Sequence, residues 1–368
     1  MNNIKVVHFS TVHQPYDIRI FHKECKTLAK YGYQVIYIVP AEKDESIDAV
    51  YIKALKKPNK RWERFTITYM RLLIAALKEK AIIYHFHDPE LIPLGLLLKM
   101  FGKRVIYDVH EDMPRDIQLK EWIPRPFRKI VACLFEKFEN FSAKRFDTVV
   151  AATPVICNRF SLQGCEAVNI NNYPINGELH SPGVRWESKE SSVCYVGGIN
   201  GIRGLFNMIE AAELADVMLI LGGEYFYEDE RLKAMGMSGW NKVVELGHLN
   251  RKEVADTLNR SMAGLVVLNP IKSFIDSLPI KLFEYMSAGI PVIASDFPIW
   301  KEIITDSQCG ICVDPLNPND IANAVKWIIS HPLEAEKMGN NGRLAIQEKY
   351  NWDIESKVLL GVYKELSV

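Results

Sequence analysis

Residues 276–295 have the sequence DSLPIKLFEYMSAGIPVIAS, which predicts a loop, a helix, a tight turn and a buried strand in that order. Pro279 suits the first helical turn, where its missing N–H costs nothing. Gly289 stands where a left-handed helix cap is needed, and Pro291 prevents the helix from continuing. The apolar run at 291–294 is typical of a short strand that is covered on both faces.

Two acidic residues of this stretch, Asp276 in the loop and Glu284 on the helix, are not explained by packing. The loop before a helix N-terminus is a favourable place for an anion, because free N–H groups and the positive end of the helix dipole meet there. Phosphates accept hydrogen bonds from N–H groups, and sugar hydroxyls donate to carboxylates. An anion site with two carboxylates nearby therefore suggests a sugar nucleotide.

The chain has 368 residues, which is too long for one ordinary core and favours two α/β domains. Its hydrophobic fraction of 48% and charged fraction of 24% are those of a soluble globular protein. The net charge is zero, but residues 1–175 hold 27 Lys and Arg against 19 Asp and Glu, whereas the remainder holds 18 against 26. This asymmetry suggests an anionic partner for the first half, and the alternative is a chance imbalance of surface charge.

The seven cysteines are scattered and odd in number, which favours a reducing compartment. Cys309 and Cys312 form a CxxC pair, but no second Cys or His pair stands nearby in the sequence, so structural thiols are preferred over a zinc site. The N-terminus has no signal-peptide pattern, and the longest apolar run, around residues 91–100, is too short to span a membrane. We therefore expect a cytoplasmic protein, or one on a membrane surface.

The chain begins with a predicted strand at residues 4–10, followed by a loop that runs into a helix. In a doubly wound domain this loop lies at the carboxyl edge of the sheet, where ligands bind. The GxGxxG fingerprint of dinucleotide-binding domains is absent from it. Arg19, near the start of the helix, is either a phosphate ligand or a solvated surface residue.

Two further predicted strands end in polar residues at the same edge. The first leads into His87 and Asp88, and the second, from Lys103, leads to Asp108 and His110. Such residues are either packed structural groups or site residues, and their repeated position at the carboxyl edge keeps the second interpretation open. A metal site built from them has low weight, because no single helix or hairpin collects the ligands.

Residues 56–80 predict a basic amphipathic helix with aromatic residues at one end. Such a helix can lie on anionic lipid, and the alternative is a helix that is solvated on one side. Residues 173–192, rich in Pro, Gly, Ser and Asn, are interpreted as an interdomain linker. The glycine-rich loop at 197–204 follows a predicted strand, so a phosphate can approach its backbone while Arg203 supplies positive charge.

Two halves of alternating strands and helices, with polar residues at the sheet edges, indicate two Rossmann-like α/β domains facing across a cleft. Over nearly its whole length the chain resembles the family 4 glycosyltransferases, which have the GT-B fold. The most specific match is the pair of acidic residues separated by seven others and followed by a helix and a Gly-x-Pro-Val turn. Here Asp276 replaces the usual first glutamate, and Glu284 is the second. Further matches are residues 16–24, 85–88, 108–111 and 310–315.

The resemblance implies an acceptor-binding domain at 1–175, a nucleotide-sugar-binding domain at 190–350, and a C-terminal helix at 351–368 that returns to the N-terminal domain. It also implies roles for single residues. Catalytic or sugar-contacting groups would be His87 and Asp276. Donor binding would involve Glu284 on the ribose, the backbone of Ser277, Leu278, Pro279 and Ile280 on the diphosphate, and Lys281, Arg203 and Gly198 beside it. The acceptor or phosphate side would include Arg19, Asp88 and His110.

One departure from the family pattern concerns the glycine loop, which usually carries an arginine after its first glycine and a lysine before a later one. This chain has Gly198 and Arg203 at these places, and Lys281 is a candidate for the missing charge. The family retains the anomeric configuration and needs no metal ion, which agrees with the missing DxD triplet. We therefore expect no cofactor and no metal site.

The predicted function is transfer of a sugar from a nucleoside-diphosphate sugar, with UDP favoured, to a lipid-linked or surface-polysaccharide acceptor. The predicted location is the cytoplasm or the inner face of the membrane, with residues 56–80 as a possible contact to anionic lipid and no nucleic acid as partner. Two alternatives remain open. One is a UDP-sugar epimerase of the same fold, and the other is a non-catalytic regulatory partner that binds nucleotide.

Overall fold

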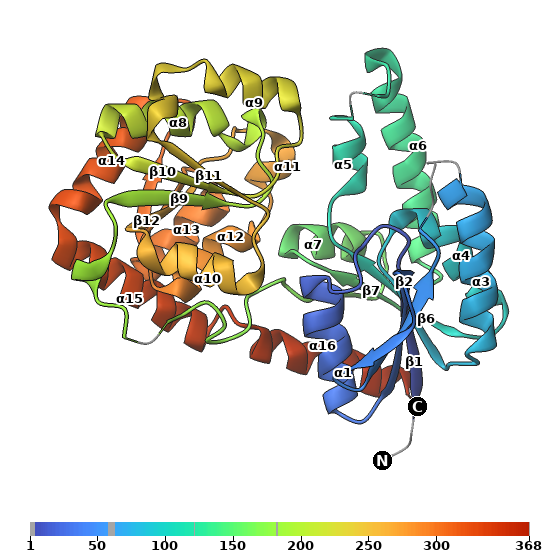
Figure 1. The fold of residues 1–368 in the computed structure, drawn as a ribbon. Coiled ribbons are helices and arrows are strands. Elements are labelled where there is room, and N and C mark those ends of the chain that lie inside the picture. The colour runs from blue at the N-terminus through green and yellow to red at the C-terminus, as the bar shows by residue number, and fades with distance from the viewer. Residues whose placement is uncertain (1–3, 58–62, 121, 182, 368) are drawn as a thin grey trace. The chain divides into compact units, whose positions relative to one another are not determined.

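The computed structural model describes residues 4–57, 63–120, 122–181 and 183–367. The chain forms two compact units (Figure 1). The first contains Met1–Asn172 together with Trp352–Val368, and the second contains Tyr173–Asn351. Each unit is built on a largely parallel β-sheet with helices in the connections, which confirms the predicted α/β class with two Rossmann-like domains.

The described residues of the first unit form an eight-stranded sheet in the order β3-β4-β2-β1-β5-β6-β7-β8. Neighbouring strands are parallel except β3 and β4. The order reverses between β1 and β5, and in such sheets ligands bind at the carboxyl ends of the strands beside the reversal. The strands are β1 (Lys5–Phe9), β2 (Gln34–Pro40), β3 (Glu45–Ile47), β4 (Val50–Leu55), β5 (Ile83–Phe86), β6 (Arg104–Val109), β7 (Thr148–Ala151) and β8 (Ala167–Asn169).

The first helical segment of this unit is a π-helix, η1 (Ile18–Cys25), which continues directly into α1 (Lys26–Lys30). The side chain of Asp17 accepts hydrogen bonds from the backbone N–H groups of Arg19 and Ile20 and so caps η1. π-Helical turns are rare and are often found at functional sites. The other helices are η2 (Arg64–Thr68), α3 (Tyr69–Lys78), η3 (Pro89–Leu91), α4 (Ile92–Met100), α5 (Met113–Ile117), α6 (Arg125–Ala143), α7 (Pro154–Leu162) and α16 (Trp352–Leu366).

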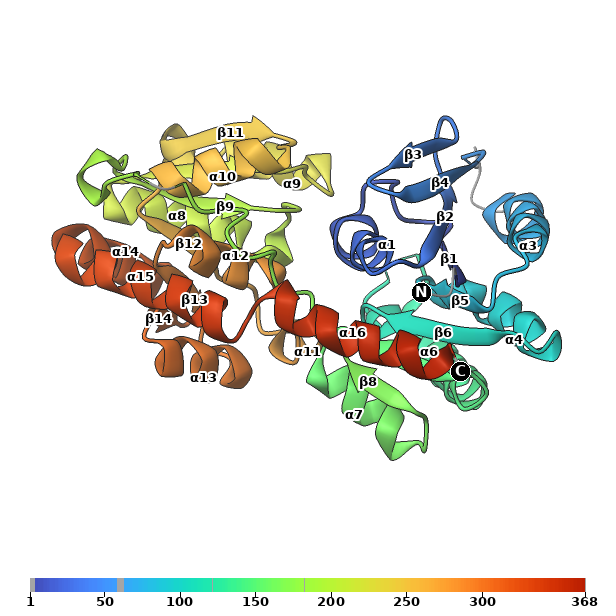
Figure 2. The same ribbon diagram turned by 90° about the horizontal axis from the view of Figure 1, so that it is seen from below.

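The C-terminal helix α16 packs on the first unit, as expected (Figure 2). The indole Nε1 of Trp352 donates to the Thr27 hydroxyl at 2.9 Å. The carboxylate of Glu355 accepts from both the backbone and the side-chain nitrogen of Asn171, at 2.8 and 3.0 Å. Tyr363 is fully buried. The helix therefore completes the polar interior of a unit whose other residues lie far away in sequence.

The single amphipathic helix predicted for residues 56–80 is wrong in extent. The described helices of this stretch are the short η2 and α3, and residues 58–62, which carry part of the predicted basic face, lie outside the described residues. Leu72 and Ala76 on α3 are fully buried in the core of the first unit. Because this face packs against the sheet, only the opposite face of α3 is available to solvent or lipid.

The second unit has a six-stranded, wholly parallel sheet in the order β11-β10-β9-β12-β13-β14 among its described residues. The order reverses between β9 and β12, so the carboxyl ends of these strands mark the expected ligand site. The strands are β9 (Ser192–Val196), β10 (Met218–Gly222), β11 (Val243–Gly247), β12 (Ala263–Val266), β13 (Val292–Ser295) and β14 (Gly310–Val313). The helices are η4 (Trp186–Ser188), η5 (Gly201–Arg203), α8 (Leu205–Ala215), α9 (Glu228–Met235), η6 (Ser238–Lys242), α10 (Arg251–Arg260), α11 (Lys272–Ile275), α12 (Ile280–Ala288), α13 (Pro298–Ser307), α14 (Pro318–Ser330) and α15 (Pro332–Glu348).

The stretch interpreted as a linker, residues 173–192, belongs to the second unit. Leu179 and Trp186 are buried in its core. The change of unit falls between Asn172 and Tyr173. The polar composition around these apolar residues concealed their packing, so the predicted start of the second domain at residue 190 is too late.

Residues 276–295 form the predicted succession of elements. Helix α12 begins directly after Pro279, which is its N-cap, and ends at Gly289, whose φ of +77° is left-handed. Strand β13 follows and is buried over its full length. The helix buries the predicted apolar face, Leu282, Phe283 and Met286.

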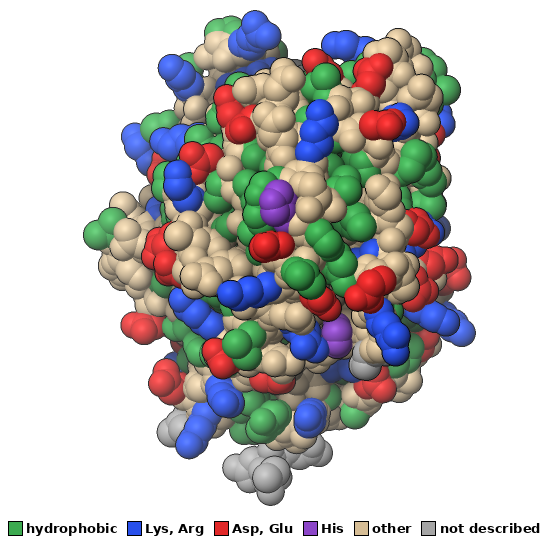
Figure 3. Space-filling view, turned by 90° about the vertical axis from the view of Figure 1, so that its left-hand side faces the viewer, with side chains coloured by type: hydrophobic (Ala, Val, Ile, Leu, Met, Phe, Trp, Pro, Cys, Tyr) green, Lys and Arg blue, Asp and Glu red, His purple; other side chains and the backbone are tan. Residues whose placement is uncertain are grey.

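Among the described residues, no helix combines the length and the hydrophobicity that crossing a lipid bilayer requires. On the face shown in Figure 3, hydrophobic side chains lie among acidic and basic ones. Neither sign of charge covers that face alone.

The close contact between the turn at Gly289 and Gly339 on helix α15 predicts that a methyl group added at Gly339 lowers the stability of the fold. A Cβ atom on Gly339 would lie 2.1 Å from the Gly289 carbonyl oxygen. We expect Gly339→Ala to lower the free energy of unfolding by about 1–3 kcal/mol, although alanine favours helices. The control is Gly361→Ala in α16, where no atom of the described part of the chain lies within 4 Å of the added Cβ, and we expect a gain of about 0.5–1 kcal/mol. Urea unfolding measures both changes, and a stabilising Gly339→Ala would contradict this close approach.

Candidate functional site

Asp108, near the carboxyl end of β6, is the centre of a buried polar cluster in the first unit. Its carboxylate accepts two hydrogen bonds from Arg19, from Nε to Oδ2 at 3.0 Å and from Nη2 to Oδ1 at 2.8 Å. Burial alone would raise the pKa of Asp108, but the charge of Arg19 and the neighbouring histidines hold this pKa well below its usual value. Asp108 is therefore a buried carboxylate that stays ionised.

Two residues predicted for the acceptor or phosphate side, Arg19 and Asp88, are buried and form hydrogen bonds within the first unit. Arg19 is 3% exposed, and its third nitrogen, Nη1, donates a hydrogen bond to the backbone oxygen of Ile170 at 2.9 Å. Asp88, also 3% exposed, accepts from the Ser10 hydroxyl at 2.9 Å and the Thr11 backbone N–H at 2.6 Å. Neither prediction for Arg19, phosphate ligand or solvated residue, agrees with this position, because η1 directs the guanidinium inward to Asp108.

His87 lies directly beside Asp108, since the register of β5 and β6 pairs the preceding residues Phe86 and Tyr107. Its Nδ1 is 3.0 Å from Asp108 Oδ2, and its Nε2 is 3.1 Å from Nδ1 of His8. Burial lowers the pKa of His87 to about 4, so the imidazole is neutral at pH 7. Both ring nitrogens face protein side chains and the residue is only 2% exposed, so a direct contact of this imidazole with a substrate is not supported.

His110 and His13 are the histidines of this cluster that keep exposed surface, with side chains 20% and 25% exposed. His110 Nε2 is 2.8 Å from Asp108 Oδ2, and the two imidazole rings meet edge to face with centroids 5.0 Å apart. Burial opposes the charged form of His13, but the hydrogen bond and charge of Asp17 outweigh it and raise the pKa of His13. His13 was missed in the sequence, where only its place in the loop after the first strand could have indicated it.

The second unit has a pocket at the carboxyl ends of β9 and β10. Backbone packs on backbone beneath it, because a Cβ atom on Gly223, whose φ is +140°, would lie 2.0 Å from the carbonyl oxygen of Gly197. Only glycine allows this approach. The pocket is lined by Val196, Gly197, Gly198, Gly222, Gly223, Glu224, Phe226, His248 and Leu249.

Two cations lie against the glycine loop of this pocket. The guanidinium of Arg203 stacks over the Phe226 ring, 4.8 Å from its centroid, and donates to the Gly198 carbonyl oxygen at 3.3 Å. The ammonium of Lys281 lies 5.0 Å from the centroid of the Tyr195 ring, and a Cβ atom on Gly197 would be 3.3 Å from its Nζ. The structure thus brings the predicted donor-side residues Arg203, Gly198 and Lys281 together at one loop.

The N-terminus of α12 offers fewer backbone donors than predicted. The N–H of Ser277 already donates to the Phe274 carbonyl oxygen at 3.1 Å, and Pro279 has no N–H. The amides of Leu278 and Ile280 have no backbone partner among the described residues. Asp276 is the C-cap of the short helix α11 (Lys272–Ile275), and this residue interacts with other parts of the protein.

Glu284, on the buried helix α12, is held by an arginine from another helix. Arg251 Nη1 donates to Glu284 Oε1 at 2.6 Å, while its Nε and Nη2 donate to the two oxygens of Glu178 at 2.9 and 2.7 Å. Glu284 is 8% exposed. The arrangement fixes the carboxylate through one oxygen. The sequence did not identify Arg251 as a site residue. The Asn250–Glu253 capping box predicts where α10 begins, but not the direction in which the side chain of its first residue points.

Two groups of described residues have the composition and spacing of a metal site. One consists of His8, Glu24, His85 and His87, and the other of His87, Asp108 and His110. Both lie in the first unit, and they include histidines from strands that the sequence placed at one edge. The Cys309–Cys312 pair is in neither group, and both thiols are free.

Two family models match the chain. Residues 176–345 match the model described as glycosyl transferases group 1, and residues 19–170 match the model of glycosyltransferase family 4. An uncharacterised glycosyltransferase of Methanocaldococcus jannaschii is 31% identical over 187 residues, which cover 48% of this chain and 46% of that protein. A D-rhamnosyltransferase of Pseudomonas aeruginosa is 23% identical over 288 residues, covering 75% and 71%. The match to the first relative thus spans only about half of its length.

Solved structures share the fold over the whole chain. The sucrose-phosphate synthase of Thermosynechococcus elongatus has a TM-score of 0.81 at 18% identity, covering 99% of both chains. An Anabaena protein in complex with UDP-glucose has a TM-score of 0.74 at 13% identity, covering 98% of this chain and all of that one. At these identities the likeness establishes the fold alone.

The buried position of Arg19 makes it a stability residue. Arg19→Met leaves the Asp108 carboxylate without its main counter-charge, and breaking a buried pair in this way costs about 3–5 kcal/mol. We expect a large drop in the urea midpoint. Arg231→Met, which breaks an exposed pair with Glu245, is the control and should leave the midpoint near that of the wild type. An Arg19 variant of unchanged stability would contradict the structural role.

Proposed function

The chain belongs to the family 4 glycosyltransferases with the GT-B fold, and we propose that it transfers a sugar from a UDP-sugar to a lipid-linked or surface-polysaccharide acceptor with retention of the anomeric configuration. That it is an enzyme that transfers sugars follows from the two family models. The choice of UDP is supported by the Anabaena protein of the same fold, which is in complex with UDP-glucose. The single observation that carries the proposal is the fixed Glu284 carboxylate on α12 of the second unit.

In the donor site we propose that Glu284 accepts hydrogen bonds from the ribose hydroxyls. Arg251 supports this role, because it occupies Oε1 and holds the carboxylate in one orientation. The diphosphate would meet the backbone N–H groups of Leu278 and Ile280, at the positive end of the α12 dipole. Lys281 and Arg203 would supply charge beside the glycine loop. Asp276 would bind hydroxyls of the donor sugar.

With two cations and a helix N-terminus at the diphosphate, the leaving group can be stabilised without a divalent ion. We therefore propose that transfer needs no metal ion at the donor phosphates. This concerns the leaving group alone and not the interior of the first unit.

In the first unit we propose that His110, not His87, contacts the reacting sugar. Asp108 binds His110 Nε2 and thereby orients the ring, and part of the side chain is exposed. His13, whose raised pKa favours the charged form, would add positive charge at the same edge. His87 would act through Asp108 as a positioning residue.

We propose that the enzyme acts in the cytoplasm at the inner face of a membrane, and that helix α6 provides the lipid contact. This 19-residue helix exposes an apolar stripe to solvent. Exposed cations on the same helix suit anionic head groups, as in helices that lie in the membrane interface. The exposed apolar residues are Phe127, Ile130, Val131, Leu134, Phe138 and Phe141, and the exposed cations are Arg125, Lys129 and Lys137.

Loss of the Glu284 carboxylate tests the donor site. Glu284→Ala leaves Arg251 paired with Glu178, so the fold should persist while transfer from UDP-glucose or another UDP-sugar falls at least about tenfold, the value of one hydrogen bond to a charged group. The rise in melting temperature on adding UDP should shrink in parallel, because UDP stabilises only the state that binds it. Assays contain no added divalent metal.

Asp216→Asn is the control, since Asp216 pairs with Lys242 at the amino ends of β10 and β11, whereas the pocket lies at the carboxyl ends. Full activity of Glu284→Ala would contradict the proposal. Conversion of free UDP-sugar without acceptor would favour the epimerase, and UDP binding without any turnover would favour the regulatory partner.

The lipid contact predicts that a triple variant of α6, Phe127→Ser with Ile130→Ser and Leu134→Ser, co-sediments several-fold less with vesicles containing anionic phospholipid. The variant removes apolar side chains that are already exposed, so the fold should be retained. Leu333→Ser with Leu344→Ser on α15 removes exposed apolar residues of the other unit and is the control. Equal sedimentation of both variants and the wild type would place the lipid contact elsewhere.

A further inference from the structure

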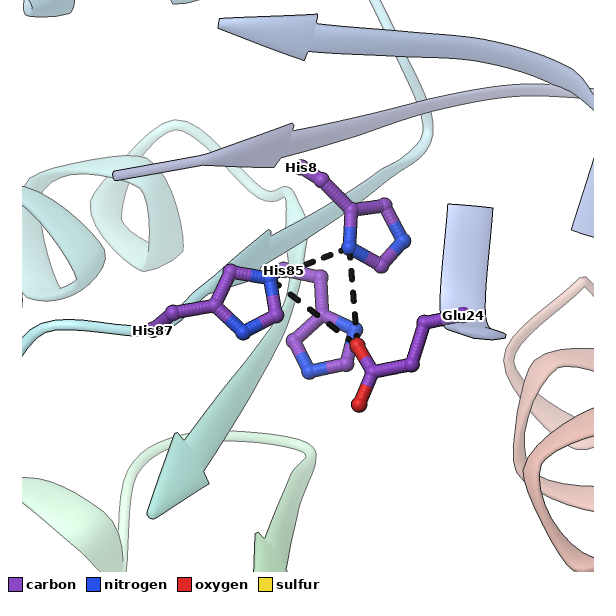
Figure 4. A group of neighbouring side chains, drawn as sticks. All are labelled: His8, Glu24, His85 and His87. Atoms are coloured by element: carbon purple, nitrogen blue, oxygen red, sulfur yellow. Dashed lines mark hydrogen bonds and ion pairs between the residues drawn. The ribbon is translucent and has the colours of Figure 1, made fainter. Parts of the chain in front are cut away.

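We propose that His8, Glu24, His85 and His87 bind one divalent transition-metal ion, zinc by their chemistry, inside the first unit (Figure 4). His8 is on β1, Glu24 on η1 and His85 on β5, with His87 two residues after it. His8 and His85 are register partners on neighbouring strands, and alternation along the chain brings His87 to the same face. The site thus collects its ligands from three elements that are separate in sequence.

The four side chains have the spacing of a metal site. One nitrogen of each histidine and one carboxylate oxygen of Glu24 lie within 4.8 Å of one another. His8 Nδ1 is 3.1 Å from His87 Nε2, and Glu24 Oε2 is 3.8 and 4.0 Å from these two nitrogens. Bonds of about 2.0–2.2 Å in a tetrahedron place zinc ligands roughly 3.3–3.5 Å apart. His8, His87 and Glu24 therefore need to adjust by only a few tenths of an ångström, and the ligand nitrogen of His85 lies within 4.8 Å of the other three ligand atoms.

The position of the Glu24 carboxylate is not explained by hydrogen bonds within the cluster alone. It is fully buried, and among the residues that the structure describes no donor meets hydrogen-bond geometry at either carboxylate oxygen, although the Asp108 carboxylate lies close enough to share a proton with it. Its nearest cation, Arg19 Nε at 3.2 Å, already donates to Asp108. A buried carboxylate without hydrogen bonds is costly, and a coordinated cation supplies the missing partner. A hydrogen bond between the His8 and His87 rings accounts for those two residues, whereas Glu24 has only the shared Arg19 and, when it carries a proton, Asp108 as partners.

The outer contacts of the histidines suit metal ligands. Asp108 accepts from His87 Nδ1 at 3.0 Å, and the Tyr363 hydroxyl lies 2.8 Å from His8 Nε2. The Asp108 carboxylate can only accept, so it directs the lone pair of His87 Nε2 into the group, as in the carboxylate–histidine–metal arrangement of zinc proteins. Tyr363 has the same effect on His8 when its oxygen accepts from Nε2. Tyr363 also lies 2.8 Å from His85 Nδ1, so α16 supports two of the three rings.

The ligand types select the metal. Three imidazoles and one carboxylate suit zinc, whereas magnesium and calcium prefer oxygen ligands alone. All four ligands are at most 2% exposed, so the ion would hold β1, η1 and β5 together and would not meet substrate.

Metal analysis of the full-length protein tests the proposal without an activity assay. Protein expressed with zinc and then dialysed should contain one zinc per chain by mass spectrometry, and cobalt substitution should give the visible absorption of a tetrahedral site. Glu24→Gln and His85→Ala should each lose most of the metal. Cys309→Ala with Cys312→Ala removes the other candidate ligands and should keep it.

A second measurement covers variants that fold poorly. Zinc should raise the melting temperature of metal-free wild type, and Tyr363→Phe, which keeps the four ligands, should bind zinc about 10–100-fold more weakly in competition with a chelating dye. No zinc uptake by the metal-free protein, or equal zinc content in wild type and both ligand variants, would overturn the proposal. These results do not depend on whether the chain transfers sugar.

Discussion

The buried ion pair between Arg19 and Asp108 is the constraint on which the proposed catalytic edge of the first unit depends. Taking two charges out of water costs several kcal/mol per ion, and the cost is offset only when every remaining donor and acceptor is satisfied. Here Arg19 uses both sides of its guanidinium, and Asp108 also binds His87 and His110. The orientation of His110 is therefore set by a network that a substrate does not have to assemble.

The proposed donor site of the second unit differs, because it consists largely of accessible backbone. Gly197 and Gly223 pack backbone against backbone and keep side chains out of the pocket beside them. Helix α12 begins directly after its N-cap residue Pro279, and no side chain of the described residues caps it. Glu284 is the fixed charge of this side, and Arg251 neutralises it while holding it in place. A donor whose phosphates meet the accessible backbone and whose hydroxyls meet the Glu284 carboxylate would fit this proposed site.

The proposed zinc site and the proposed catalytic edge share Asp108. One oxygen of its carboxylate lies within hydrogen-bonding distance of a buried histidine, His87, and of a partly exposed one, His110. A metal ion bound to His87 would thus help to fix the orientation of His110 through Asp108 without contacting substrate. Tyr363 extends the same support to the C-terminal helix, which gives a physical reason for the return of α16 to the first unit.

The sequence by itself determined the features that rest on local interactions. These are the α/β alternation, helix α12 with its left-handed Gly289, the position of Glu284 on that helix, and the family. Only the tertiary structure decided which polar residues face solvent, because their partners are distant in sequence. Arg19 meets Asp108 across 89 residues, and Arg251 meets Glu284 across 33. A histidine at the end of a strand looks the same in sequence whether or not other parts of the chain bury it. The sequence therefore favoured His87 as the catalytic histidine, whereas the structure buries His87 and leaves part of the His110 side chain exposed.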